Sequence, residues 1–139
     1  MEHRADARGH ARRPAVIYLH TSAAYKLLSR EPEVSEVEAL FAEGTELLSS
    51  RLLEVELQAT VLRRGGALED VAAILRRVEL DAVDDEIIDH ALSLQAGLRA
   101  MDALHLSTAL LYGTDVSAIA TYDRELALAA ERHGLAIHR

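Results

Sequence analysis

The sequence of 139 residues contains no cysteine and no tryptophan, and only one phenylalanine and two prolines. Without cysteine, the chain can form no disulfide, no thiolate zinc site and no cysteine nucleophile. A reducing cytoplasm suits this composition, and we predict a cytoplasmic location. No apolar run approaches the roughly 20 residues that a membrane-spanning helix requires, so we expect no membrane partner. Because half of the residues are hydrophobic, Leu, Ala, Val and Ile must form the core.

An excess of positive charge is also missing, since the formal net charge is −8. Proteins that hold nucleic acid by overall electrostatic attraction are basic, so this class is excluded. A nuclease that works through bound cations remains allowed, because the cations reverse the field of its clustered carboxylates. Arginines are concentrated in residues 1–13. We predict a disordered basic extension there and a single domain over residues 14–139.

Apolar patterning predicts strands that alternate with helices. The run Ala15–Leu19 is apolar throughout, as in a strand that is buried on both faces of a parallel sheet. The expected strands span 15–19, 46–49, 79–83, 117–121 and 135–138, and the expected helices 23–29, 34–42, 51–64, 68–78, 84–97, 101–112 and 123–133. This alternation predicts an α/β fold, with a mostly parallel sheet of four to five strands and helices on both faces.

Four side chains with metal-binding chemistry stand out against this pattern. His20 directly follows the first strand, and Asp123 follows a later one. Glu56 and Asp102 lie in helical sequence that is otherwise largely apolar. Burying such carboxylates without compensation is costly, and a shared divalent cation is the simplest compensation. Since ligands of parallel sheets bind at the carboxyl ends of the strands, we predict a metal site there.

Four segments, in this order, resemble the signatures of the VapC toxins, which are PIN-domain ribonucleases. They are Ile-Tyr-Leu-His-Thr-Ser-Ala from Ile17, Leu-Glu-Val-Glu-Leu with Glu56, Leu-Arg-Ala-Met-Asp-Ala-Leu-His-Leu-Ser-Thr-Ala with Asp102, and Ala-Thr-Tyr-Asp-Arg-Glu-Leu with Asp123. Each segment alone is a weak signal, but the order and spacing match from Ile17 to the C-terminus. One position departs from the pattern: VapC toxins carry an aspartate where this chain has His20.

The resemblance implies a PIN-like three-layer sandwich over residues 14–139 and a Mg²⁺- or Mn²⁺-dependent endoribonuclease. Its RNA substrate would be tRNA, rRNA or mRNA. The chain would be the toxin of a type II toxin–antitoxin system, a homodimer inhibited by a VapB-like antitoxin. The implied metal ligands are Glu56, Asp102, Asp123 and, in weakened form, His20. Near a helix N-terminus that favours anions, Thr21 or Ser22 would orient a metal-bound water or a phosphate oxygen.

His20 changes the chemistry of its position. A carboxylate brings a negative charge and two oxygens, whereas a neutral imidazole brings one nitrogen and no charge. Because Mg²⁺ prefers oxygen ligands in near-octahedral geometry, we predict that it binds poorly, while Mn²⁺ or Zn²⁺ can still use the imidazole. The chain is then an inactivated toxin, a natural variant with altered metal use, or a retuned active enzyme. We favour the first and predict that His20→Asp restores cleavage.

Single residues of this set also have ordinary structural explanations. Asp102 and Asp123 can serve as helix caps or first-turn acids, and Glu56 can pair with an arginine. We interpret His105, three residues after Asp102, as a packed or hydrogen-bonded structural histidine. Arg99 is either a contact for phosphate or an antitoxin carboxylate, or one half of a surface ion pair.

Three other functions compete with the toxin interpretation. The first is a PIN nuclease of RNA processing that has no antitoxin. The second is a degenerate, non-catalytic PIN domain that only binds partners, for which His20 is the supporting feature. The third is a phosphoacceptor domain like that of response regulators, which needs a lysine near a later strand. The sole lysine is Lys26 in the first predicted helix, so we set this last function aside.

Overall fold

A five-stranded parallel sheet forms the centre of the computed structural model, which describes residues 15–29, 34–42 and 44–138. The strands are ordered β3-β2-β1-β4-β5. Their bounds are β1 (Val16–Leu19), β2 (Glu46–Ser50), β3 (Val78–Asp81), β4 (Ala118–Ala120) and β5 (Ala136–Ile137). The predicted α/β fold is therefore confirmed. The predicted basic extension, residues 1–13, lies outside the described residues.

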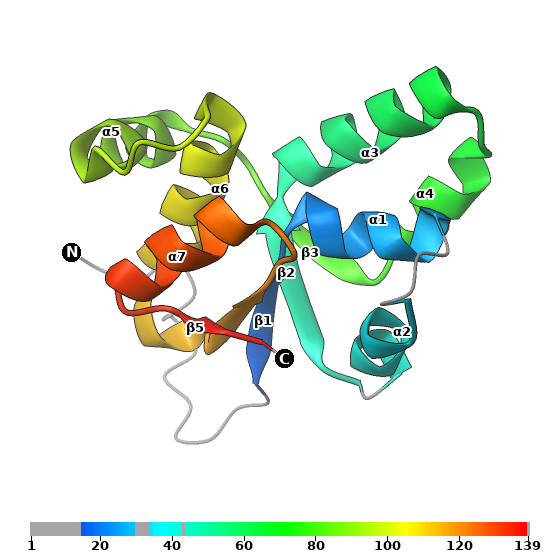
Figure 1. The fold of residues 1–139 in the computed structure, drawn as a ribbon, viewed down its shortest axis with the longest axis horizontal. Helices are drawn as coiled ribbons and strands as arrows, with labels where there is room; N and C mark the ends of the chain where they lie inside the picture. The colour runs from blue at the N-terminus through cyan, green and yellow to red at the C-terminus, as the bar shows by residue number, and fades with distance from the viewer. Residues whose placement is uncertain (1–14, 30–33, 43, 139) are drawn as a thin grey trace.

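Helices cover both faces of the sheet (Figure 1). One side carries α1 (Thr21–Ser29), α2 (Val34–Ala42), α3 (Arg51–Arg64) and α4 (Leu68–Leu75), and the other carries α5 (Asp85–Leu94), α6 (Ala100–Leu111) and α7 (Arg124–Arg132). Successive side chains of a strand point to opposite faces. Accordingly, Ile17 and Leu19 of β1 join one hydrophobic cluster, and Val16 and Tyr18 join the other. None of the described helices has the length and apolarity needed to cross a membrane.

Two helices end earlier than predicted. The predicted extension of α4 to residue 78 is wrong, because Val78 pairs with Leu47 as the first residue of β3. The predicted extension of α5 to residue 97 is also wrong: the helix ends at Leu94, and Gln95 adopts a left-handed conformation with φ 48°. The start of α5 agrees with the prediction, since the side chain of Asp84 caps its first turn.

The start of α1 differs from the prediction in a way that matters for the site. The predicted helix begins at residue 23, whereas α1 begins two residues earlier, so Thr21 and Ser22 are its first two residues. The Thr21 hydroxyl donates to Glu56, and the Ser22 hydroxyl accepts the backbone N–H of Tyr122. These hydroxyls therefore connect the first turn of α1 to α3 and to the segment that follows β4.

The strand order reverses at β1. From β1 the chain passes to β2 and β3 on one side, and it later returns to β4 and β5 on the other. Such a reversal leaves a crevice beyond the carboxyl ends of the two strands that flank it. Leu19 and Ala120, which end β1 and β4, are partners in register. The residues that follow them, His20 and Thr121, consequently lie side by side in the crevice.

Candidate active site

The four predicted metal ligands come from separate parts of the chain to the carboxyl edge of the sheet. His20 follows β1, and Asp123 lies between β4 and α7. Glu56 lies in the second turn of α3, and Asp102 in the first turn of α6. The helix α3 starts directly after β2 because the side chain of Ser50 caps it. This cap aims the early turns of α3, and hence Glu56, at the same crevice.

His20 is buried, and both of its ring nitrogens have protein partners. Nε2 lies 3.0 Å from Asp102 Oδ1, and since a carboxylate only accepts, Nε2 carries the proton. Nδ1 accepts the backbone N–H of Ser22 at 3.3 Å and lies 2.9 Å from the hydroxyls of Ser22 and Thr121. The hydrogen bond from His20 outweighs burial and lowers the pKa of Asp102. In this arrangement neither nitrogen is open to a metal ion.

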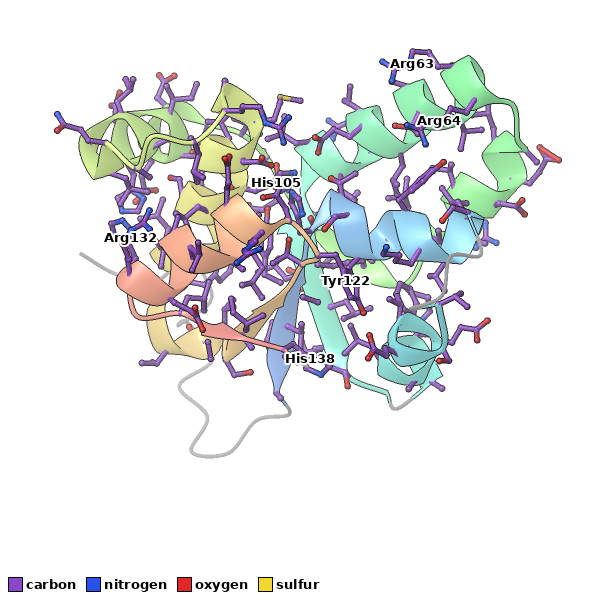
Figure 2. All side chains as sticks on the ribbon, viewed as in Figure 1. Arg63, Arg64, His105, Tyr122, Arg132 and His138 are labelled. Carbon is purple, nitrogen blue, oxygen red and sulfur yellow. The ribbon has the colours of Figure 1, made fainter. Side chains whose placement is uncertain are left out.

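A second buried histidine, His105, lies next to the first, with 5.0 Å between the ring centroids. Figure 2 labels His105. Its Nε2 lies 2.7 Å from Glu56 Oε1, and its Nδ1 lies 2.7 Å from the Tyr18 hydroxyl. Burial lowers the pKa of His105 and raises the pKa of Tyr18, so the imidazole is neutral and the phenol protonated. The phenol therefore donates to Nδ1, and Nε2–H donates to Glu56. The prediction of a hydrogen-bonded structural histidine is confirmed.

Glu56 receives a second hydrogen bond from outside the core. The Thr21 hydroxyl donates to Glu56 Oε1 at 2.6 Å. Burial opposes the ionisation of Glu56, but the hydrogen bonds from His105 and Thr21 outweigh burial, and the pKa of Glu56 is lowered. The result is a charged carboxylate that is fixed from two directions.

Asp123 caps a helix and faces the crevice at the same time. Its Oδ1 accepts the backbone N–H of Leu126 in the first turn of α7 at 2.9 Å. Its Oδ2 lies 3.4 Å from Arg99 Nη2, and the same nitrogen lies 3.6 Å from Asp102 Oδ2. Arg99 thus forms the ion pair considered in the sequence, and it bridges two acids that belong to different helices.

Two residues of the network were missed by sequence reasoning. Thr121 contacts His20. The predicted strand 117–121 includes Thr121, whereas β4 ends at Ala120, so Thr121 directly follows its strand as His20 follows β1. Tyr18 lies inside the apolar run of β1, where nothing distinguishes it from a core residue. Its hydroxyl could be placed next to His105 only once the packing of α6 against the sheet was known.

The donor atoms suit a hard divalent cation only in part. Carboxylate oxygens are the ligands that Mg²⁺ prefers. However, within the described part of the chain, no group of three or more His, Asp or Glu side chains is arranged to hold a metal ion. Each carboxylate instead pairs with a nitrogen-bearing side chain: Asp102 with His20, Glu56 with His105, and Asp123 with Arg99. The acids have the right chemistry, but His20 occupies an oxygen of one of them, Asp102.

Comparison with known proteins gives concordant matches. The PIN domain family matches residues 17–132. Ribonuclease VapC46 of Mycobacterium tuberculosis is 34% identical over 125 residues, which covers 88% of this chain and 96% of the relative. Ribonuclease VapC47 of the same species is 34% identical over 118 residues, covering 80% and 87% respectively.

Solved structures give the same picture of the fold. VapC20 of Mycobacterium tuberculosis, a toxin that cleaves the sarcin–ricin loop, matches with a TM-score of 0.67 at 19% identity, covering 88% of this chain and 98% of that one. VapBC2 of Rickettsia felis, solved with a DNA fragment from its promoter, matches with a TM-score of 0.65 at 18% identity, covering 88% and 97%.

Proposed function

The chain belongs to the PIN-domain family and, within it, to the VapC ribonucleases, the endoribonuclease toxins of type II toxin–antitoxin systems, and from this premise we propose where and how it acts on RNA. The proposed active site is the carboxylate cluster, defined as Glu56, Asp102 and Asp123. We propose that the cluster acts with Mg²⁺ or Mn²⁺ and that His20 impairs it.

One observation carries the proposal: three acids from distant parts of the sequence share one connected network at the strand reversal. The neighbouring rings of His20 and His105 connect Asp102 with Glu56. On the other side, one guanidinium connects Asp102 with Asp123. Three carboxylates at one edge of a sheet repel one another, which is unfavourable. A purely structural role therefore does not explain why they lie together.

The chain's own residues would bind and position the RNA. A divalent cation, when bound to the carboxylate cluster, lowers the pKa of a water molecule and stabilises charge on phosphate oxygens. The N-termini of α1, α6 and α7 are at this edge of the sheet, and their dipoles favour an anionic substrate. The hydroxyls of Thr21 and Ser22, in the first turn of α1, lie where they could orient a phosphate oxygen or a water molecule.

The impairment by His20 follows from its contacts. Its Nε2–H donates to an oxygen of Asp102 that a cation would need. The imidazole also supplies no negative charge, so the cluster loses one of the four acids that VapC toxins carry. Both effects weaken the binding of a divalent cation, and of Mg²⁺ most strongly because it prefers oxygen.

Family membership also supports proposals about partners and location. The Rickettsia felis relative was solved as a VapBC2 complex, and we propose a VapB-like antitoxin as the partner of this chain. We further propose a homodimer and a cytoplasmic location. We propose that the substrate is cellular RNA, namely tRNA, rRNA or mRNA, in line with the sarcin–ricin loop that VapC20 cleaves.

The decisive experiment compares RNA cleavage by the chain with cleavage by His20→Asp, in Mg²⁺ and in Mn²⁺. We expect His20→Asp to cleave on the order of 100-fold faster in Mg²⁺, equivalent to about 3 kcal/mol of barrier. Adding Asp102→Asn to His20→Asp should abolish the gain. Equal Mg²⁺-dependent rates for the two forms would refute the impairment. If neither form cleaves RNA, the chain is a non-catalytic binding module instead.

A further inference from the structure

Arg99 lies over two acids of the carboxylate cluster from the solvent side. Its Nη2 is 3.4 Å from Asp123 Oδ2 and 3.6 Å from Asp102 Oδ2. The Arg99 side chain is 79% exposed, whereas those of Asp102 and Asp123 are 11% and 20% exposed. The acids are therefore held within the protein, and the guanidinium covers them from outside.

The base of Arg99 is fixed, but its tip is held only loosely. Arg99 is the N-cap residue of α6, and its carbonyl accepts the backbone N–H of Ala103 at 2.9 Å. Both ion-pair distances exceed the roughly 2.7–2.9 Å of a tight charge-assisted hydrogen bond. Asp102 keeps its bond from His20, and Asp123 keeps its helix cap, when the guanidinium leaves. The arginine can therefore change partners without disturbing the acids.

An open hollow borders the guanidinium. It has a volume of about 590 Å³, and its lining consists of Arg99, Tyr122, Asp123, Arg124 and Glu125. Tyr122, one of these lining residues, is 40% exposed. A planar guanidinium in such a hollow offers paired N–H donors to an anion that lies beside the carboxylate cluster.

A phosphodiester that reaches these acids meets strong repulsion unless a cation intervenes. Two unit charges 4 Å apart interact by about 4 kcal/mol at an effective dielectric constant of 20. Asp102 and Asp123 both oppose the phosphate in this way, and the guanidinium that neutralises them is already in place. A guanidinium also matches the geometry of phosphate oxygens.

We infer that Arg99 is a substrate-binding residue, whose guanidinium turns from the two carboxylates to a phosphate of single-stranded RNA as the strand enters the hollow, and stays between that phosphate and the acids. This inference rests on the proposed function and adds the residue that receives the RNA backbone. A carboxylate of a protein partner is the competing occupant, and the experiment below separates the two.

The experiment measures binding without cleavage. A labelled single-stranded oligoribonucleotide of mixed sequence is titrated with protein in EDTA, across a series of KCl concentrations, and followed by fluorescence anisotropy. We expect Arg99→Ala to weaken binding about tenfold at low salt. It should also reduce the slope of log K against log salt by about 1, the signature of one lost phosphate contact. Arg99→Lys, which keeps the charge, should keep the slope.

The matched control is Arg132→Ala. Arg132 is exposed at the opposite end of α7 from the hollow (Figure 2), and its removal changes the net charge equally. If Arg99→Ala and Arg132→Ala bind RNA alike while the parent binds it, the inference is overturned and the proposed function stands. In that case Arg99 serves a protein partner or only the fold. If the parent chain binds no RNA at low salt in EDTA, the inference fails, while the cleavage comparison with His20→Asp in Mg²⁺ decides the proposed function separately.

Discussion

The two histidine–carboxylate pairs at the carboxyl edge of the sheet look alike but have different consequences. His105 donates to Glu56 at 2.7 Å, and its other nitrogen is satisfied by Tyr18 in the core. His20 donates to Asp102 at 3.0 Å, and its other nitrogen faces hydroxyl groups near the surface. The first pair orients an acid. The second engages an oxygen of Asp102, and its histidine stands at position 20, where VapC toxins carry another aspartate.

Under the proposed function, a histidine that hydrogen-bonds an acid of the carboxylate cluster either supports or blocks that acid, depending on whether the histidine lies in the core or in the crevice. Tyr18, the other partner of His105, belongs to the hydrophobic core. The bond from His105 to Glu56 therefore takes no space in the crevice. His20 instead stands in the crevice itself, where a cation and its ligands would have to fit. The variants below test this contrast, beginning with the largest expected effect.

Removing the core histidine should cost the most stability. His105→Leu leaves the Glu56 carboxylate and the Tyr18 hydroxyl without their shared partner, and we expect the free energy of unfolding to fall by about 3 kcal/mol. His20→Leu should cost clearly less, because Ser22 and Thr121 still contact each other at 3.2 Å. Urea denaturation of both variants measures this. Equal losses would contradict the contrast between the pairs.

Restoring the acid at position 20 should couple stability to a divalent cation. At a Mn²⁺ concentration 100 times its Kd, binding to the native state adds about 2.7 kcal/mol to the free energy of unfolding. We expect such an effect for His20→Asp and a much smaller one for the parent chain at the same concentration, measured as the change in Tm. His20→Asp combined with Asp102→Asn is the control. A parent chain that is stabilised as strongly as His20→Asp would show that the imidazole does not block the site.

Removing the phenol hydroxyl tests the direction of the buried hydrogen bonds. Tyr18→Phe deprives His105 Nδ1 of its donor, and we expect a loss of about 1 kcal/mol in urea denaturation. Nitrogen NMR shifts of the parent should place the His105 proton on Nε2. A proton on Nδ1 would mean that Tyr18 accepts and that Glu56 lacks the donor assigned to it here.

The smallest expected effect is a pH dependence that belongs to the core histidine. The pKa of His105 is lowered by burial. Below about pH 6.5, His105 therefore binds a proton in the unfolded chain but stays neutral in the folded chain. Stability should therefore fall by at most about 0.7 kcal/mol as the pH drops from 7 to 6, and further below pH 6. The pKa values of Glu56 and Asp102 are also lowered, so their contribution is lost only below about pH 4.

Urea denaturation between pH 7 and pH 5 checks this assignment. His105→Gln keeps a donor for Glu56 but cannot take up a proton, so its stability should vary less with pH than that of the parent. Identical pH profiles for the two proteins would show that another group causes the dependence.

Much of the fold could be predicted because it depends on patterns that are local in sequence. The run that ends at Leu19 is apolar throughout, which predicts a strand in the interior of a sheet. In the structure it forms β1, which pairs with β2 on one side and β4 on the other. The end of α4 could not be predicted in the same way. Val78 suits a helix as well as a strand, and its pairing with Leu47, a long-range contact, decides the outcome.

The site shows the same limit at the level of side chains. Sequence placed His20, Glu56, Asp102 and Asp123 near one another, because parallel strands and their following helices share an edge. It could not say which acid pairs with which base, since that depends on how α6 approaches the sheet. The contact of Asp102 with His20 rather than with its neighbour His105 follows from this packing.

The pairing of β1 with β4 has a consequence for synthesis of the protein. Tyr18 pairs with Ile119, so the central strand lacks one of its neighbours until most of the chain has left the ribosome. The crevice needs Thr121 beside His20 and Asp123 beside Arg99, and an unfinished polypeptide offers neither. A truncated or stalled product of translation that ends before Thr121 therefore lacks the complete carboxylate cluster proposed as the active site, which can assemble only after Asp123 has been added to the chain.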